Sequence, residues 1–149
     1  MKYVFLFDGF GVTVKHWAET PDDPQERGTR VEVQRLHELP PEQFYFAQER
    51  VLREPFFRAD LFSLDAGPPG NWESAHYHPN FLENWSPSDR AWDATLSKNP
   101  TAWMQSQFEN MRELLRRGGA PDLAEKVDDA EVQKAMPHMI AAVEACYKG

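Results

Sequence analysis

The chain has 149 residues, 41% of them hydrophobic and 13% aromatic, a composition that predicts a single domain over residues 1–149 and excludes a wholly disordered chain. Its formal net charge of −8, from 16 basic and 24 acidic residues, disfavours binding to nucleic-acid phosphates, which needs a positive surface. The single cysteine excludes an intrachain disulfide, and the apolar run near the N-terminus is too short for a signal-peptide core or a membrane span.

The first elements expected along the chain are the two strands of a hairpin. Residues 2–7 and 12–18 are rich in β-branched and aromatic side chains, and the residues between them contain the Asp-Gly pair that is typical of a tight turn. In the second strand His16 continues a row formed by Val12 and Val14. We expect His16 to reach solvent or a backbone partner; the alternative is that it joins the later histidines in one site.

A polar loop and a third strand come next. Residues 19–28 contain two prolines and many charges, which predicts a surface loop, and residues 29–36 then alternate as a strand. Residues 42–52 fit both a helical apolar stripe and a strand alternation. Their content of Glu, Gln and Arg, with a proline where the first turn would lie, favours a helix.

The central feature of the sequence is a second predicted hairpin, which ends in His-x-His-Pro. Its strands are residues 56–64 and 72–78, and the turn between them, residues 65–71, is rich in proline and glycine. The prolines in this turn lack the N–H groups that a phosphate-binding loop uses. We therefore expect a structural turn at this place.

The register of this hairpin decides whether its polar residues meet. Symmetric pairing about the turn places Asp60 opposite His76 or His78, and an even register brings all three residues and Arg58 to one face of the sheet. A slip of one residue would put the histidines on the other face from Asp60. The predicted site therefore depends on the register.

The His-x-His pair is a candidate for metal binding. On a strand it places two imidazoles on the same side, about 7 Å apart at Cα. Two imidazoles with one carboxylate suit Zn²⁺, Fe²⁺ or Mn²⁺ and leave coordination positions open for water or substrate. His76, His78 and Asp60 are the candidate ligands, with Glu83 as another possible carboxylate. The alternative is a pair of histidines that are exposed or make only hydrogen bonds.

The same face offers acid–base chemistry without a metal. Asp60 would orient one imidazole as a general base, and Arg58 would bind an anionic group of a substrate. An ordinary cross-strand ion pair between Arg58 and Asp60 is the simpler alternative. The candidate catalytic residues are therefore Asp60, His76, His78 and Arg58, since the sequence has no nucleophile motif, glycine-rich phosphate loop or zinc-finger cysteine pattern.

The second half of the chain is predicted to be helical over residues 86–147. Ser86-Pro87 and Asn99-Pro100 each combine an N-cap residue with a proline in the first turn, which is typical of a helix start. Gly118-Gly119 predicts a helix end and Ala120-Pro121 a new start. Pro137 interrupts the last helical region, so that helix either bends there or begins anew.

Strands in residues 2–80 followed by helices in residues 86–147 predict an α+β fold. We expect a curved antiparallel sheet of about five strands, covered on one face by three or four C-terminal helices. Met104, Phe108, Met111 and Leu115 recur at helical spacing and are expected to face this sheet. The alternative is a small ligand-binding barrel followed by the same helices.

Two functions of different classes fit these patterns. The acidic charge and the five tryptophans favour a cytoplasmic protein-interaction or regulatory module, whose partner is a protein or a small molecule. The alternative is a small metal-dependent or acid–base enzyme, or a ligand-binding protein, built on Asp60, His76 and His78. Its cofactor would be a divalent transition metal, Zn, Mn or Fe. No membrane partner is expected.

Overall fold

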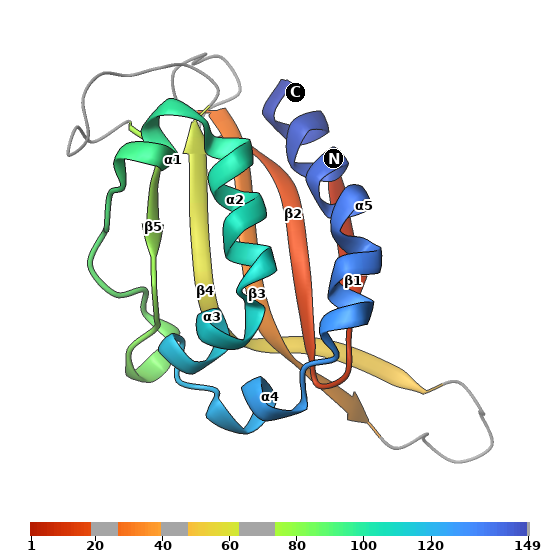
Figure 1. Cartoon of the computed structure of the whole chain (residues 1–149). Helices are drawn as coiled ribbons and strands as arrows, with labels where there is room; N and C mark the ends of the chain where they lie inside the picture. Colours follow the sequence, from red (N-terminus) through yellow and green to blue (C-terminus); the bar gives the residue numbers. More distant parts are fainter. Residues whose placement is uncertain (19–26, 40–47, 63–73, 149) are drawn as a thin grey trace.

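Five antiparallel strands form an open sheet in the N-terminal half of the chain (Figure 1). The computed structural model covers the whole chain and describes residues 1–18, 27–39, 48–62 and 74–148. Each strand pairs with its neighbour in the sequence, and within the described ranges no ladder joins the first strand to the last. The strands are β1 (Lys2–Leu6), β2 (Phe10–Ala18), β3 (Arg27–Leu39), β4 (Glu49–Phe62) and β5 (His76–His78). The predicted antiparallel sheet is therefore confirmed, and the barrel alternative is wrong.

The helices follow the sheet in the chain and cover one of its faces (Figure 1). They are α1 (Ala94–Lys98), α2 (Pro100–Glu109), α3 (Met111–Arg117), α4 (Pro121–Lys126) and α5 (Asp129–Lys148), with a 3-10 turn, η1 (Glu83–Trp85), before them. The predicted α+β arrangement is confirmed. The described residues contain five α-helices, more than the three or four expected, because Asn110 leaves the helical conformation and separates α2 from α3.

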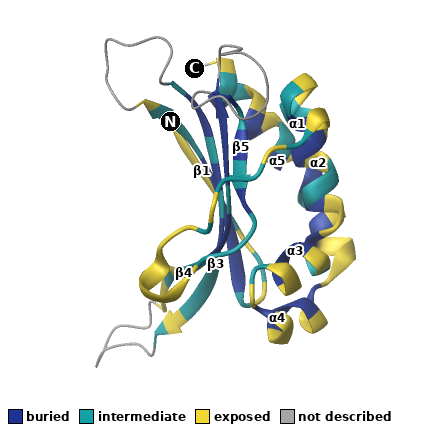
Figure 2. Cartoon of the chain, turned by 90° about the vertical axis from the view of Figure 1, so that its left-hand side faces the viewer, coloured by how far each residue is buried: buried dark blue, intermediate teal, exposed yellow. Residues whose placement is uncertain are grey.

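The hydrophobic core lies between the sheet and these helices. All four residues of the predicted helical stripe are buried there, although Asn110 divides the stripe between α2 and α3. Across the core, Val12 and Val14 of β2 and Phe57 of β4 point toward the helices. Figure 2 shows the buried side of each long helix facing the sheet. The core therefore contains residues from both halves of the chain.

Two predicted helix starts are confirmed, because α2 begins at Pro100 and α4 at Pro121. The side-chain oxygen of Asn99 accepts a hydrogen bond from the N–H of Ala102 at 3.0 Å, and Pro100 is the first residue of α2. The capping side chain satisfies an N–H that has no partner inside the helix, and proline has no N–H to satisfy.

The predicted start at Ser86-Pro87 is wrong. The first α-helix begins at Ala94, where the Asp93 side chain accepts hydrogen bonds from the N–H groups of Thr95 and Leu96. The preceding segment instead runs beside β5, because Ala91 and Tyr77 exchange two backbone hydrogen bonds of 2.8 and 3.0 Å. These tertiary hydrogen bonds override the local signal for a helix.

The helix favoured for residues 42–52 is wrong where the structure describes it. Residues 49–52 belong to β4 and pair with the end of β3, with Leu36 opposite Leu52 and Leu39 opposite Glu49. The register of the ladder shifts next to Gln34, whose partner is Pro55, and proline cannot donate a hydrogen bond to a ladder. Residues 42–47 of that prediction, the 65–71 turn and most of the 19–28 loop lie outside the described residues.

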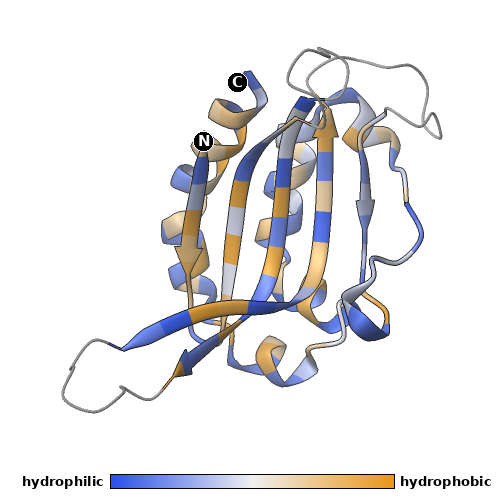
Figure 3. Ribbon diagram, turned by 180° about the vertical axis from the view of Figure 1, so that it is seen from behind, coloured by the Kyte–Doolittle hydropathy of each residue, from blue (hydrophilic) through white to orange (hydrophobic). Residues whose placement is uncertain are grey.

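The two faces of the sheet carry different side chains. In β4, Ala59 and Leu61 belong to the core, so Asp60 between them points to the face away from the helices. In β3, the Thr29 hydroxyl donates to the backbone oxygen of Val143 in α5, so Thr29 faces the helices. Arg30, the next residue, therefore points to the face away from them. Figure 3 shows that far face from behind, with hydrophobic and hydrophilic residues alternating along the long strands. The candidate site lies on this face.

Candidate metal centre

The pairing of β4 with β5 has the even register on which the predicted site depends. Asp60 lies opposite His76, and Arg58 lies opposite His78, with Ala59 and Tyr77 paired between them. Alternating residues of a strand point to opposite faces, so the four polar residues share the face away from the helices. The prediction that the hairpin brings them together is confirmed.

Three of these four residues are buried. Asp60 and His76 are each 2% exposed and His78 is 4% exposed, although none of the described helices covers this face. Aromatic rings surround His76: the centroid of the Phe62 ring lies 5.9 Å from its imidazole and that of the Trp92 ring 6.4 Å away. Buried ionisable groups are rare unless they are paired, so the contacts of this cluster need to be followed atom by atom.

Two arginines hold the Asp60 carboxylate. Arg30, directly opposite on β3, places its Nε 2.5 Å from Oδ1, and Arg58 places its Nε 2.9 Å from Oδ2. Burial alone would raise the pKa of Asp60, but the contact with His76 and the charges of Arg30 and Arg58 outweigh burial and hold this pKa well below its usual range. Asp60 is therefore a carboxylate at neutral pH.

Backbone carbonyls fix the proton on one nitrogen of each imidazole. His76 Nδ1 lies 3.0 Å from the backbone oxygen of Ser74, and His78 Nδ1 lies 2.6 Å from that of Ser88. A carbonyl oxygen only accepts hydrogen bonds, so Nδ1 is the donor in both rings. Carbonyl acceptors of this kind also orient histidines that bind metals through Nε2.

The Nε2 atoms point toward Asp60. Oδ2 of Asp60 lies 3.5 Å from His76 Nε2 and 3.9 Å from His78 Nε2, and the three potential ligand atoms all lie within 4.8 Å of one another. Within the part of the chain that the structure describes, His76 Nε2 is buried and has no hydrogen-bond partner.

His78 is held in its neutral form, with Arg58 beside its free nitrogen. Arg58 Nη2 lies 3.4 Å from His78 Nε2. Burial lowers the pKa of His78, and although the hydrogen bond to Ser88 opposes this effect, the charge of Arg58 adds to it. Neutral His78 with its proton on Nδ1 therefore presents a lone pair on Nε2.

The other candidate residues lie elsewhere. His16 points to the opposite face, where its Nδ1 is 3.1 Å from the backbone oxygen of Cys146 in α5, so it does not join the cluster. Glu83 is exposed. The expectation of a backbone partner for His16 is confirmed.

Sequence reasoning missed three parts of the cluster. The position of Arg30 could have been predicted. Arg30 alternates with apolar residues of β3, so it belongs to the polar face of the sheet, and a sheet in which successive strands are neighbours places β3 beside β4. The contacts of the histidines with the carbonyls of Ser74 and Ser88 could not have been predicted from the sequence. Every residue carries the same backbone oxygen, and only the fold determines which of these oxygens lies beside a histidine.

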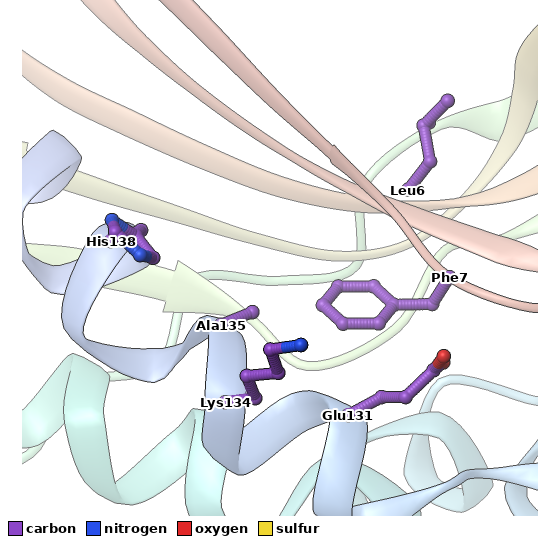
Figure 4. Close-up of a pocket in the computed structure, with 6 residues that line it drawn as sticks. All are labelled: Leu6, Phe7, Glu131, Lys134, Ala135 and His138. Carbon is purple, nitrogen blue, oxygen red and sulfur yellow. The ribbon is translucent and has the colours of Figure 1, made fainter.

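A separate recess lies at the other edge of the sheet, between the end of β1 and α5 (Figure 4). It has a volume of about 300 Å³ and is lined by Leu6, Phe7, Glu131, Lys134, Ala135 and His138. The Phe7 ring points toward α5. Because β1 and β5 are at opposite edges, this recess is distinct from the candidate metal centre.

Comparison with known proteins finds no matching family model, curated protein or solved structure. No helix in the described residues is long and apolar enough to cross a membrane. Any functional assignment must therefore be argued from the geometry of the cluster.

Proposed function

We propose that the protein binds one divalent transition metal ion, Zn²⁺, Mn²⁺ or Fe²⁺, through His76 Nε2, His78 Nε2 and the Asp60 carboxylate. The observation that carries this proposal is the buried Nε2 of His76, which faces Asp60 without a hydrogen-bond partner among the described residues.

The electrostatics of the cluster favour a cation at this place. His78, with its proton on Nδ1, directs the lone pair of Nε2 at the Asp60 carboxylate, so like-signed charge densities face one another in a buried environment, and His76 Nε2 faces the same carboxylate. A metal ion between the three atoms turns this repulsion into coordination. The lone pairs and the carboxylate are the forms of these groups that bind metals.

The distances also suit a metal. Tetrahedral coordination with bonds of about 2.0–2.1 Å places neighbouring ligand atoms roughly 3.4 Å apart. The two Nε2 to Oδ2 distances are 3.5 and 3.9 Å and all three ligand atoms lie within 4.8 Å of one another, so side-chain movements of up to about an ångström would bring them to bonding positions. Three protein ligands leave a coordination position for water or substrate, where a bound metal supplies Lewis acidity.

A general acid–base site without metal fits the geometry less well. Asp60 would have to accept a hydrogen bond from the imidazole that it orients, but its distance of 3.5 Å to His76 Nε2 exceeds the usual 2.7–3.2 Å. Both carboxylate oxygens already accept from arginines, and both Nδ1 atoms donate to backbone oxygens instead.

The experiment is metal analysis of protein purified without a histidine tag, followed by competition with a chromophoric chelator. Wild type is expected to bind one ion per chain, and His76→Ala or His78→Ala to weaken binding by at least about 100-fold, more than the loss of an outer-shell partner. His138→Ala is the matched control, because His138 is an exposed histidine. Absence of stoichiometric binding by wild type, or equal affinity in all three variants, would refute the proposal.

Protein interaction is a second candidate function, favoured by the exposed outer edge of β1. This strand lies at the edge of the sheet, and Tyr3, Val4 and Leu6 are between 37% and 47% exposed. An apolar edge strand accepts an extended segment of a partner by β-sheet addition, and the net charge of −8 favours a basic partner. The test is amide protection of β1 on adding basic peptides of alternating apolar residues. Val4→Lys is expected to abolish it; equal protection in the variant would contradict this candidate.

A further inference from the structure

Arg58 occupies a distinctive place beside the proposed metal ligands. Its Nε donates to Asp60 Oδ2 at 2.9 Å, and its Nη2 lies 3.4 Å from His78 Nε2. A guanidinium N–H group can only donate and His78 Nδ1 is committed to the Ser88 carbonyl, so His78 Nε2 is the acceptor in this contact. Arg58 therefore contacts two of the three atoms that the metal would use.

We infer that the ligand of this centre is a small oxyanion, such as a carboxylate or a tetrahedral oxyanion, and that Arg58 binds it beside the metal. This inference rests on the proposed function. One lone pair cannot serve both a metal ion and an N–H group, so metal binding takes the acceptor away from Arg58 Nη2. The N–H group that is left lies next to the metal and needs a new acceptor, because an unpaired polar group at a largely buried site is costly.

The charge of the site points the same way. Arg30 and Arg58 together carry two positive charges against the single negative charge of Asp60, and a divalent metal would raise the local excess from one to three. On the same face, Lys15 and Glu32 form an ion pair at 3.0 Å and offset each other. The two arginine side chains are only 19% and 21% exposed, so water screens this excess poorly. A negatively charged ligand offsets it.

The metal ion and the Arg58 guanidinium would together select an oxyanion with at least two oxygen atoms. One oxygen would fill the open metal position and another would accept from the guanidinium, whose planar array of N–H donors matches carboxylates and phosphates. Metal and anion would then strengthen each other's binding by the same factor, because coupling between two ligands is reciprocal.

The test measures zinc affinity by chelator competition in the presence of sulfate, acetate or chloride at constant ionic strength. Sulfate or acetate is expected to raise the zinc affinity of wild type by about 5-fold or more relative to chloride, which is at the lower end of typical coupling. The two anions separate tetrahedral oxyanions from carboxylates. Arg58→Gln is expected to bind zinc without this enhancement, and Arg58→Lys, which keeps the charge but loses the planar donor array, to retain only part of it.

Lys15→Gln is the matched control. It also removes a cation from this face of the sheet, but Lys15 is already paired with Glu32. It is expected to keep the full enhancement. Thermal unfolding of each metal-free variant checks that it folds. If Arg58→Gln does not fold, Arg58→Lys still tests the inference.

The outcomes separate the inference from the proposed function. If wild type binds zinc but neither anion changes its affinity, or if the Arg58 variants keep the full enhancement, the inference is overturned and the metal site stands. If wild type binds none of Zn²⁺, Mn²⁺ and Fe²⁺, the proposed function fails and the inference fails with it. Enhancement that is lost with Arg58 and kept with Lys15→Gln supports both.

Discussion

His76 and Asp60 face each other across the β4–β5 ladder, with His76 Nε2 3.5 Å from Asp60 Oδ2. Both residues are buried, and the Nδ1 atom of the ring is committed to the backbone oxygen of Ser74. The nitrogen that faces Asp60 therefore has a cation as its natural partner, either a proton or a metal ion. This relationship is the basis of the metal proposal, and it leads to tests of both the site and the sheet that holds it.

The first prediction concerns the stability of the metal-free protein. Asp60→Ala should lower the free energy of unfolding by about 3 kcal/mol, because it removes the carboxylate that pairs with two partly buried arginines. Urea denaturation measures the change. Asp122→Ala is the control: its ion pair with Arg35 is largely exposed, so its removal should change stability little. Equal effects of the two substitutions would show that the Asp60 cluster does not stabilise the fold.

The second prediction is a dependence of stability on pH, again without metal. The pKa of Asp60 is lower in the folded protein than in the unfolded chain, so the unfolded chain binds a proton first as the pH falls. The contribution of Asp60 to the free energy of unfolding is therefore fully present above about 3.9, the pKa of aspartate in an unfolded chain, and declines as the pH falls below that value. Urea titrations between about pH 2 and 6 should show a steeper decline for wild type than for Asp60→Asn. Parallel curves would contradict this account.

The third prediction tests the close approach of β3 to β4 beside the site. A Cβ atom on Gly28 would lie 1.9 Å from the backbone oxygen of Leu61, and backbone cannot move away as a flexible side chain can. Gly28→Ala should therefore destabilise the protein strongly, by about 3 kcal/mol or more, or prevent folding. Gly119→Asn is the control, because a Cβ there meets nothing within 4 Å and asparagine tolerates its positive φ of 88°. Circular dichroism during urea unfolding measures both variants, and a Gly28→Ala variant as stable as wild type would contradict the pairing.

The fourth prediction concerns Pro137, which lies inside α5 and cannot donate a backbone hydrogen bond. The sequence left open whether the helix bends or begins anew there, and the structure shows one helix from Asp129 to Lys148. Pro137 is exposed, so alanine should restore a helical hydrogen bond without disturbing the core. Pro137→Ala should raise the free energy of unfolding by about 1–3 kcal/mol in urea titrations. A loss of stability would indicate that proline is needed at this position.

The sequence predicted the parts of this structure that depend on short-range patterns. Alternation of apolar and polar residues indicated β2 and β3, and helical spacing identified the buried stripe from Met104 to Leu115. The candidate ligands could also be identified from the sequence, because His76, His78 and Asp60 belong to two strands that were predicted to pair. Whether the register was even or odd was left open, and the structure has the even register.

The remaining features depend on contacts between distant segments. Residues 49–52 form a strand because β3 provides a ladder for them, and residues 86–93 stay extended because Ala91 pairs with Tyr77. Neither partner can be identified from local propensity. The burial of Asp60 between Arg30 and Arg58, and the backbone oxygens that orient the histidines, likewise appear only when the strands are in place.

The central claim is tested most directly by a crystal structure of zinc-loaded protein with diffraction data collected on both sides of the zinc absorption edge. The account predicts one anomalous peak per chain, about 2.0–2.1 Å from His76 Nε2, His78 Nε2 and an oxygen of Asp60. A peak on an Nδ1 atom, a peak elsewhere in the molecule, or no peak at these three residues would contradict it.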